Sequence, residues 1–268
     1  MKGPMPIKGK GLSMNYELTG NEGAPVVVLS HSLGSSLVMW EPQLPALEPH
    51  FRILRYDTRG HGGSEAAAGP YTFELLAEDV VGLLDGLGLS RIHFIGLSMG
   101  GMIGQALGLV HPDRLLSLTL CDTAAANPPG SREIWQERID LVREEGLTPL
   151  LEPTLERWFR PEFIRQAPPI LEKIRRQFLA TSINGYVGCS QAIMELDYLE
   201  RLPQIKAPTL IVVGEEDPGT PVGAARAIQE RISGSRLAVL PKARHLSSVE
   251  QPEAFNRAVL EFLTLIRK

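Results

Sequence analysis

Short apolar runs alternate along this chain with longer segments in which apolar residues recur every three or four positions. Runs that are apolar throughout are typical of strands buried on both faces of a parallel sheet, and the longer segments are typical of the helices that cover it. A further strand at 11–19 is expected at the edge of the sheet, in a leading hairpin. The pattern predicts an α/β fold with six core strands, at 26–30, 51–56, 92–96, 115–120, 209–213 and 236–240, and helices near 221–231 and 251–267.

The alternation stops between about 124 and 203, where amphipathic helical segments such as 132–143 and 169–179 follow one another. Pro128-Pro129-Gly130 marks the beginning of this segment, and the Pro residues at 203 and 208 mark its end, because Pro and Gly interrupt helices and set turns. We interpret it as a helical cap inserted into one domain. Residues 1–123 and 204–268 would form the core, and residues 124–203 the cap.

The composition is that of an ordinary globular protein. The 268 residues are 43% hydrophobic, but no apolar stretch approaches the roughly 20 residues of a membrane span and no export signal is recognisable, so we expect a soluble cytoplasmic protein without a membrane partner. Cys121 and Cys189 are expected to be reduced thiols. A net charge of −4 without a basic block argues against nucleic acid. No metal-ligand or nucleotide-binding spacing occurs, so no metal or cofactor is expected, and the oligomeric state is not indicated.

A candidate nucleophile lies in Gly96-Leu97-Ser98-Met99-Gly100, where a predicted strand gives way to a predicted helix. This setting is typical of a nucleophile elbow, a sharp turn on which larger residues two positions before or after the serine would collide with neighbouring backbone. A glycine-rich turn that only packs the helix against the sheet is the alternative. We predict that Ser98 is the nucleophile of a serine hydrolase.

The serine needs a base, which in this fold follows it in the chain. Of the two histidines after Ser98, His111 follows too closely to leave an acid-bearing strand between them. His245 follows the last predicted strand, in a loop at the carboxyl edge of the sheet, and is the predicted base. His50, His61 and His93 are expected to have structural roles.

The acid that orients the base should also leave a strand at this edge. Asp217 fits best, because it follows the predicted strand 209–213 and one helix and one strand separate it from His245. Three alternatives remain open: the neighbouring Glu215 and Glu216, and Asp122 after the strand 115–120.

Backbone N–H groups should stabilise the oxyanion that develops on the substrate. The segment His31-Ser32-Leu33-Gly34 follows the strand 26–30, the position from which one such donor comes. We predict the N–H groups of Leu33 and Met99 as the oxyanion hole.

Aromatic and basic residues of the predicted cap are candidates for substrate binding. Trp135, Trp158, Phe159 and Tyr186 either line a pocket near Ser98 or form the core of the cap. Arg132 and Arg138 flank Trp135 and either pair with a substrate carboxylate or are solvated at the surface. Trp135 and Arg138 are the predicted substrate-binding residues.

Several motifs are distributed over nearly the whole chain: Ser32-Leu33-Gly34, Met39-Trp40, 55–62, 96–104, 120–125, Arg157-Trp158-Phe159 and 245–252. Together they resemble those of one α/β-hydrolase family, the 3-oxoadipate enol-lactonases. Asp122 stands where many members have Asn.

The resemblance implies an α/β-hydrolase fold, with a mostly parallel eight-stranded sheet flanked by helices and an inserted helical cap. It implies a carboxylic ester hydrolase that opens a small-molecule substrate, 3-oxoadipate enol-lactone, to 3-oxoadipate through an acyl-enzyme in the β-ketoadipate pathway of aromatic catabolism. A broad-specificity carboxylesterase or perhydrolase with the same triad is the alternative reading. A hydrolase-fold receptor without turnover is a third.

Overall fold

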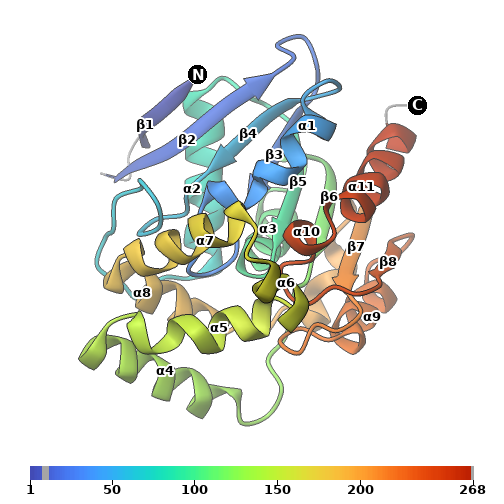
Figure 1. Ribbon diagram of the computed structural model, residues 1–268. Helices are drawn as coiled ribbons and strands as arrows, with labels where there is room; N and C mark the ends of the chain where they lie inside the picture. Colours follow the sequence, from blue (N-terminus) through green and yellow to red (C-terminus); the bar gives the residue numbers. More distant parts are fainter. Residues whose placement is uncertain (8–11, 267–268) are drawn as a thin grey trace.

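The computed structural model describes residues 1–7 and 12–266 of the chain (Figure 1). A single eight-stranded sheet runs through it in the order β1-β2-β4-β3-β5-β6-β7-β8. Neighbouring strands from β4 to β8 are parallel, as the apolar runs predicted, and the α/β fold class is confirmed. The strands are β1 (Lys2–Ile7), β2 (Leu12–Gly20), β3 (Val26–Ser30), β4 (Arg52–Tyr56), β5 (Ile92–Leu97), β6 (Leu115–Cys121), β7 (Thr209–Gly214) and β8 (Arg236–Leu240).

The leading hairpin differs from its prediction. The strand expected at 11–19 is β2, but it lies between β1 and β4 and is not at the edge; Gly11 lies outside the described residues. The edge strand is β1, which contains Pro4 and Pro6. Proline cannot donate a ladder hydrogen bond, so within a sheet it is tolerated mainly in edge strands. Because the two prolines interrupt the apolar pattern, that pattern did not predict β1.

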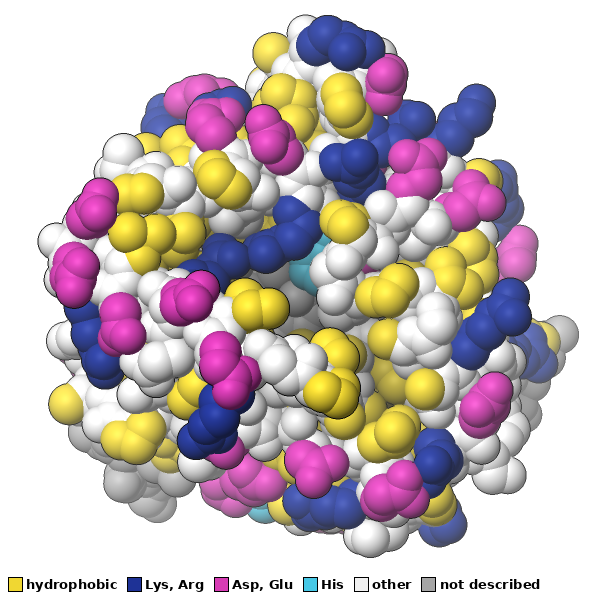
Figure 2. All heavy atoms as spheres, turned by 90° about the horizontal axis from the view of Figure 1, so that it is seen from below, with side chains coloured by type: hydrophobic (Ala, Val, Ile, Leu, Met, Phe, Trp, Pro, Cys, Tyr) yellow, Lys and Arg dark blue, Asp and Glu magenta, His cyan; other side chains and the backbone are white. Residues whose placement is uncertain are grey.

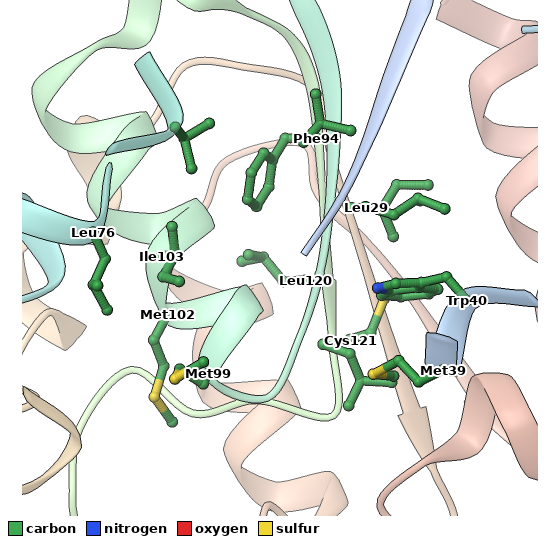
Figure 3. Close-up of a cluster of buried hydrophobic side chains, with 14 of the residues drawn as sticks. Leu29, Met39, Trp40, Leu76, Phe94, Met99, Met102, Ile103, Leu120 and Cys121 are labelled. Carbon is green, nitrogen blue, oxygen red and sulfur yellow. The ribbon is translucent and has the colours of Figure 1, made fainter. Parts of the chain in front are cut away.

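Helices cover both faces of the sheet. Figure 3 shows buried side chains on its two sides, with Leu76 and Ile103 on one side and Met39 and Trp40 on the other. The ring of Trp40 packs against Phe255 of α11 (Pro252–Ile266), at 6.0 Å between ring centroids. The helices of the core are η1 (Leu37–Gln43), α1 (Leu44–Leu47), α2 (Phe73–Gly86), α3 (Met99–Val110), η2 (Pro112–Arg114), α9 (Val222–Arg231), α10 (Ser247–Glu250) and α11 (Pro252–Ile266).

A helical insertion lies between β6 and β7, where the sequence predicted one, and occupies the lower part of Figure 1. The two helices predicted within it, at 132–143 and 169–179, correspond to α4 (Ser131–Glu145) and α7 (Pro169–Ala180). We retain 124–203 as the proposed extent of the cap. Its helices are α4 (Ser131–Glu145), η3 (Thr148–Leu150), α5 (Leu151–Trp158), α6 (Pro161–Gln166), α7 (Pro169–Ala180), α8 (Ile183–Met194) and η4 (Leu199–Gln204).

The cap meets the core at a close backbone contact. Gly60, in the loop after β4, lies so near Gly185 of α8 that a Cβ on Gly60 would be 2.2 Å from the Cα of Gly185. The N–H of Ser182 donates to the carbonyl of Gly60 at 3.0 Å. Because any side chain at either glycine would separate the two backbones, this pair fixes α8 directly on the core.

No helix in residues 1–7 and 12–266 is both long enough and apolar enough to cross a membrane.

Candidate active site

Ser98 occupies a strained turn between β5 and α3. Its φ of 57° and ψ of −115° are rare for a residue with a side chain, and such strain persists only where the surroundings impose it. The Ser98 N–H donates to the carbonyl of Cys121 at 2.8 Å, and the Thr123 hydroxyl donates to the carbonyl of Ser98 at 2.8 Å. The backbone of Ser98 is therefore held from β6 and the loop that follows it.

The glycines on either side of Ser98 allow the turn to form. A Cβ on Gly96 would lie 2.1 Å from the carbonyl oxygen of Gly100, and a Cβ on Gly100 would lie 2.2 Å from the carbonyl oxygen of Ser30. Both distances are far inside van der Waals contact, so the turn excludes any larger residue at these positions. The structure thus has the strand, sharp turn and helix that the sequence predicted around Ser98.

His245 and Asp217 converge on Ser98 from the loops after β8 and β7. The Nε2 atom of His245 lies 2.8 Å from Ser98 Oγ, and its Nδ1 atom lies 2.8 Å from Asp217 Oδ2. All three residues are at most 8% exposed. The structure therefore brings together the three residues that the sequence put forward as nucleophile, base and acid, whereas Glu215 and Glu216 are exposed.

Hydrogen bonds occupy both carboxylate oxygens of Asp217. Oδ1 accepts from the N–H groups of Gly219 (2.8 Å) and Thr220 (3.1 Å), and Oδ2 accepts from the Thr220 hydroxyl (2.6 Å) as well as facing His245. Burial tends to raise the pKa of Asp217, but the charge of His245 and these hydrogen bonds outweigh burial and lower the pKa below its usual value. Asp217 is thus an anion that points at His245. No sequence pattern points to Thr220, whose role depends on how the loop folds back.

The N–H groups of Leu33 and Met99 have no acceptor among the described residues. Leu33 lies in the loop after β3 and shares one cavity with Ser98, and Met99 directly follows Ser98. The loop after β3 is held in place by His61, whose Nε2 accepts the N–H of Gly34 at 3.1 Å. Burial and the neighbouring His31 lower the pKa of His61 to about 3, so the ring is neutral and can accept. Because the N–H groups of Leu33 and Met99 have no acceptor among the described residues, both are free to bind a ligand.

A cavity of about 180 Å³ lies beside Ser98 and is lined by both the core and the cap. Leu33, Ser98 and His245 line it from the core. Trp135 and Arg138, the predicted substrate-binding residues, line it from the cap. Figure 2 shows the hollow, in which dark-blue basic side chains lie beside a cyan histidine. The site can therefore hold a small molecule next to the serine hydroxyl.

The family of the chain follows from its sequence match. Residues 25–252 match the α/β-hydrolase fold family. The chain belongs to this family.

Several relatives of this α/β-hydrolase support the resemblance to enol-lactonases. The 3-oxoadipate enol-lactonase 2 of Acinetobacter baylyi is 40% identical over 253 residues, 94% of each chain. The crystal structure of the enol-lactonase from Burkholderia xenovorans LB400 matches with a TM-score of 0.93 at 41% identity, over 98% of this chain and all of that one. A putative carbamate hydrolase RutD of a Caulobacter species is 33% identical over 89% of this chain and 90% of its own. The resemblance is confirmed, and it extends to more than one kind of hydrolase.

Asp122, the alternative acid, holds two loops of the hydrolase together. Its Oδ1 accepts the N–H of Gly214 at 2.7 Å, and its Oδ2 accepts the hydroxyl of Ser247 at 2.5 Å. The structure thus connects Asp122 to the strand that leads to Asp217 and to the helix after His245, and not to the imidazole. Complete burial and the charge of Asp217 raise the pKa of Asp122 well above its usual value.

This raised pKa makes Asp122→Asn a stability test. A carboxyl whose pKa is higher in the folded state destabilises the fold as pH rises above its unfolded value of about 4. Asparagine can accept the Gly214 N–H through its amide oxygen, and its NH2 can donate to the Ser247 hydroxyl oxygen, which reverses the second hydrogen bond, without this cost. We expect Asp122→Asn to raise the free energy of unfolding by about 1 kcal/mol or more at pH 8, and the gain to vanish near pH 4. Urea unfolding of the variant and the wild type at both pH values measures this change in the free energy of unfolding. A variant that is less stable than the wild type at pH 8 would contradict the prediction.

The other predicted residues are distributed between cavity and core. Of the cap aromatics, Trp135 and Trp158 line the cavity, whereas Phe159 and Tyr186 are buried in the cap. Arg132 forms an exposed ion pair with Glu195. Among residues 1–7 and 12–266, no group of three His, Cys, Asp or Glu side chains is placed to hold a metal ion.

Two histidines expected to be structural lie within the core. His61 is buried beneath the loop after β3, and His93 is buried in β5, where its Nδ1 lies 2.8 Å from the hydroxyl of Ser117.

Proposed function

We propose that this α/β-hydrolase cleaves a carboxylic ester bond, with Ser98 as nucleophile, His245 as base and Asp217 as the acid that orients it. The observation that carries the proposal is the continuous contact from Ser98 Oγ to His245 to Asp217, with both distances at 2.8 Å. A serine hydroxyl is a poor nucleophile until an imidazole accepts its proton, and this arrangement supplies one.

The mechanism follows from where each group lies. Ser98 Oγ attacks the carbonyl carbon as its proton passes to His245 Nε2, and Asp217 stabilises the imidazolium that forms. The negative charge on the carbonyl oxygen is stabilised by the N–H groups of Leu33 and Met99. The ester C–O bond then breaks as the His245 imidazolium gives its proton to the leaving oxygen, which yields an acyl-enzyme. The neutral imidazole next takes a proton from water, which attacks the acyl carbon, and Ser98 Oγ leaves with that proton.

For the substrate, we propose 3-oxoadipate enol-lactone, a five-membered ring that opens to 3-oxoadipate. The two enol-lactonase relatives support this choice, as does a cavity of about 180 Å³, which suits a small acid better than a long-chain ester. The leaving group would be an enolate, a far better leaving group than an alkoxide. Base catalysis of water attack by His245 would then matter more than protonation of the leaving oxygen.

A hydrolase of other esters or carbamates with the same triad is the second candidate, favoured by the RutD relative. A broad carboxylesterase or perhydrolase belongs to this candidate class.

Turnover of two substrates distinguishes the candidates. We expect kcat/KM for 3-oxoadipate enol-lactone to exceed that for phenyl acetate by at least about 100-fold, because a pocket selects its substrate through transition-state contacts. Ring opening is measured as the loss of lactone absorbance, and ester cleavage is measured as the release of phenol. The reverse preference would favour the esterase. Negligible turnover of both, with tight binding of either, would favour a receptor.

A further inference from the structure

Arg157 presents an unpaired cation to the cavity. Its side chain, from α5, lines the cavity with Ser98 and His245. Among the described residues it has no hydrogen bond and no ion pair, although other cap arginines have such partners: Arg132 pairs with Glu195, and Arg175 with Glu152. Burial and the nearby charge of Arg138 lower the pKa of Arg157 to about 10, so it remains charged at neutral pH.

Arg138 also lines the cavity, but its guanidinium is already engaged. Its Nε donates to the Tyr186 hydroxyl and its Nη2 donates to Thr154 Oγ1 at 3.0 Å. The same group lies over the rings of Trp135 and Tyr186, at 5.6 Å from each centroid. Of the two cavity arginines, Arg157 is the one whose donors have no partner within residues 1–7 and 12–266.

A guanidinium largely removed from water and left without an anion is costly to the fold. The charge of Asp217 acts on Arg157 through space, but the hydrogen bonds of Asp217 go to Gly219, Thr220 and His245. Arg157 therefore has donors to spare for an anion that enters the cavity, and a planar guanidinium suits a carboxylate because it can bind both oxygens.

The position of Arg157 indicates which part of the substrate carries this anion. Arg157 and His245 flank the same glycine: a Cβ on Gly219 would lie 3.6 Å from Arg157 Cδ and 3.6 Å from His245 Nδ1. In the proposed mechanism the leaving oxygen faces His245, while the carbonyl oxygen points at Leu33 and Met99. The side chain of Arg157 thus passes beside the ring of His245, the group that the leaving oxygen faces.

From this placement we infer that Arg157 binds a carboxylate on the leaving-group part of the substrate, which makes it a specificity-determining residue. The inference rests on the proposed ester cleavage at Ser98. It defines a substrate class: esters and lactones whose alcohol or enol part carries a carboxylate separated from the ester oxygen by two carbon atoms. In 3-oxoadipate enol-lactone the carboxymethyl group is attached to the ring carbon bonded to that oxygen, so the compound is a member of the class.

A pair of lactones tests the inference. The probes are 3-oxoadipate enol-lactone and α-angelica lactone, which has the same ring with methyl in place of carboxymethyl. We expect Arg157→Gln to lower kcat/KM for the carboxymethyl lactone by about 10- to 100-fold, the loss of a charge-assisted contact, and to change the value for the methyl lactone by less than about 3-fold. The variant should unfold at a midpoint temperature no lower than that of the wild type, because the charge that is removed forms no ion pair.

Two matched variants serve as controls. Arg132→Gln removes the same charge from the cap outside the cavity and should leave both lactones unaffected. Arg138→Gln tests the competing cation. The inference would be overturned if the preference for the carboxymethyl lactone were lost in Arg138→Gln but not in Arg157→Gln. It would also be overturned if Arg157→Gln lowered kcat/KM equally for both lactones, or if the wild type turned over both lactones at equal rates.

Aryl esters separate this inference from the enol-lactone assignment. 2-Acetoxybenzoate carries its carboxylate on the leaving group, separated from the ester oxygen by two carbon atoms, and phenyl hemisuccinate carries it on the acyl part. Arg157-dependent preference for the first, without turnover of either lactone, would support the inference and overturn the enol-lactone assignment. Arg157-dependent preference for the second would overturn the inference and leave ester cleavage intact.

Discussion

Replacing Ser98 by alanine is expected to lower kcat by about five to six orders of magnitude, the loss typical when the nucleophile of a triad is removed. The fold should survive, because the contacts that hold this strained turn come from the backbone of Ser98, to Cys121 and Thr123, and not from its hydroxyl. Alanine keeps the Cβ and removes only the oxygen that faces His245. Single-turnover kinetics with the purified variant measure the loss.

Covalent labelling provides the control for this substitution. A fluorophosphonate should label the wild-type protein at Ser98 and leave the alanine variant unlabelled, as seen by peptide mass spectrometry. Labelling at another serine, or a variant with near-normal turnover, would overturn the assignment of Ser98 as nucleophile.

Asp217→Asn is expected to lower kcat by about four orders of magnitude while the geometry is retained. The asparagine amide can donate its N–H to Nδ1 of His245. The proton of the neutral imidazole then lies on Nε2, so Nε2 cannot accept a proton from Ser98. Hydrogen bonds from Gly219 and Thr220 to the remaining oxygen should hold the loop in place. The pre-steady-state rate of acylation with an activated aryl ester reports the effect.

Glu216→Gln is the matched control, since Glu216 lies on the same loop but is exposed. Near-normal acylation is expected in this variant. If Glu216→Gln or Asp122→Asn lost activity to the same extent and Asp217→Asn did not, a different acid would orient His245.

The candidate triad could be predicted because each of its members follows a strand. Parallel strands bring their carboxyl ends to one edge of the sheet, so Ser98, Asp217 and His245 were expected to meet there before any contact was known. The same reasoning left Asp122 as an alternative acid, since it also follows a strand. Only the paths of the loops place Asp217 against the imidazole and Asp122 against Gly214 and Ser247.

Residues whose position depends on packing between distant segments could not be predicted. Thr220 contacts Asp217 because the loop after β7 turns back on itself, a feature without a sequence pattern of its own. Arg157 reaches the cavity because of how α5 of the cap lies on the core, and periodicity along α5 says nothing about this orientation. Sequence reasoning therefore put forward Arg138, which flanks a tryptophan, and missed Arg157.

The contact between Gly60 and Gly185 bears on how new members of this fold could be built. A cap taken from a relative would sit in the same orientation only if its counterpart of α8 also brought a glycine to this point, because even a methyl group would move the whole helix outward. The loop that contains Gly60 also contains His61, which holds the loop of Leu33 through Gly34. A poorly matched cap graft would therefore impair turnover as well as substrate choice, and recombination between relatives should succeed where this pair of glycines is inherited together.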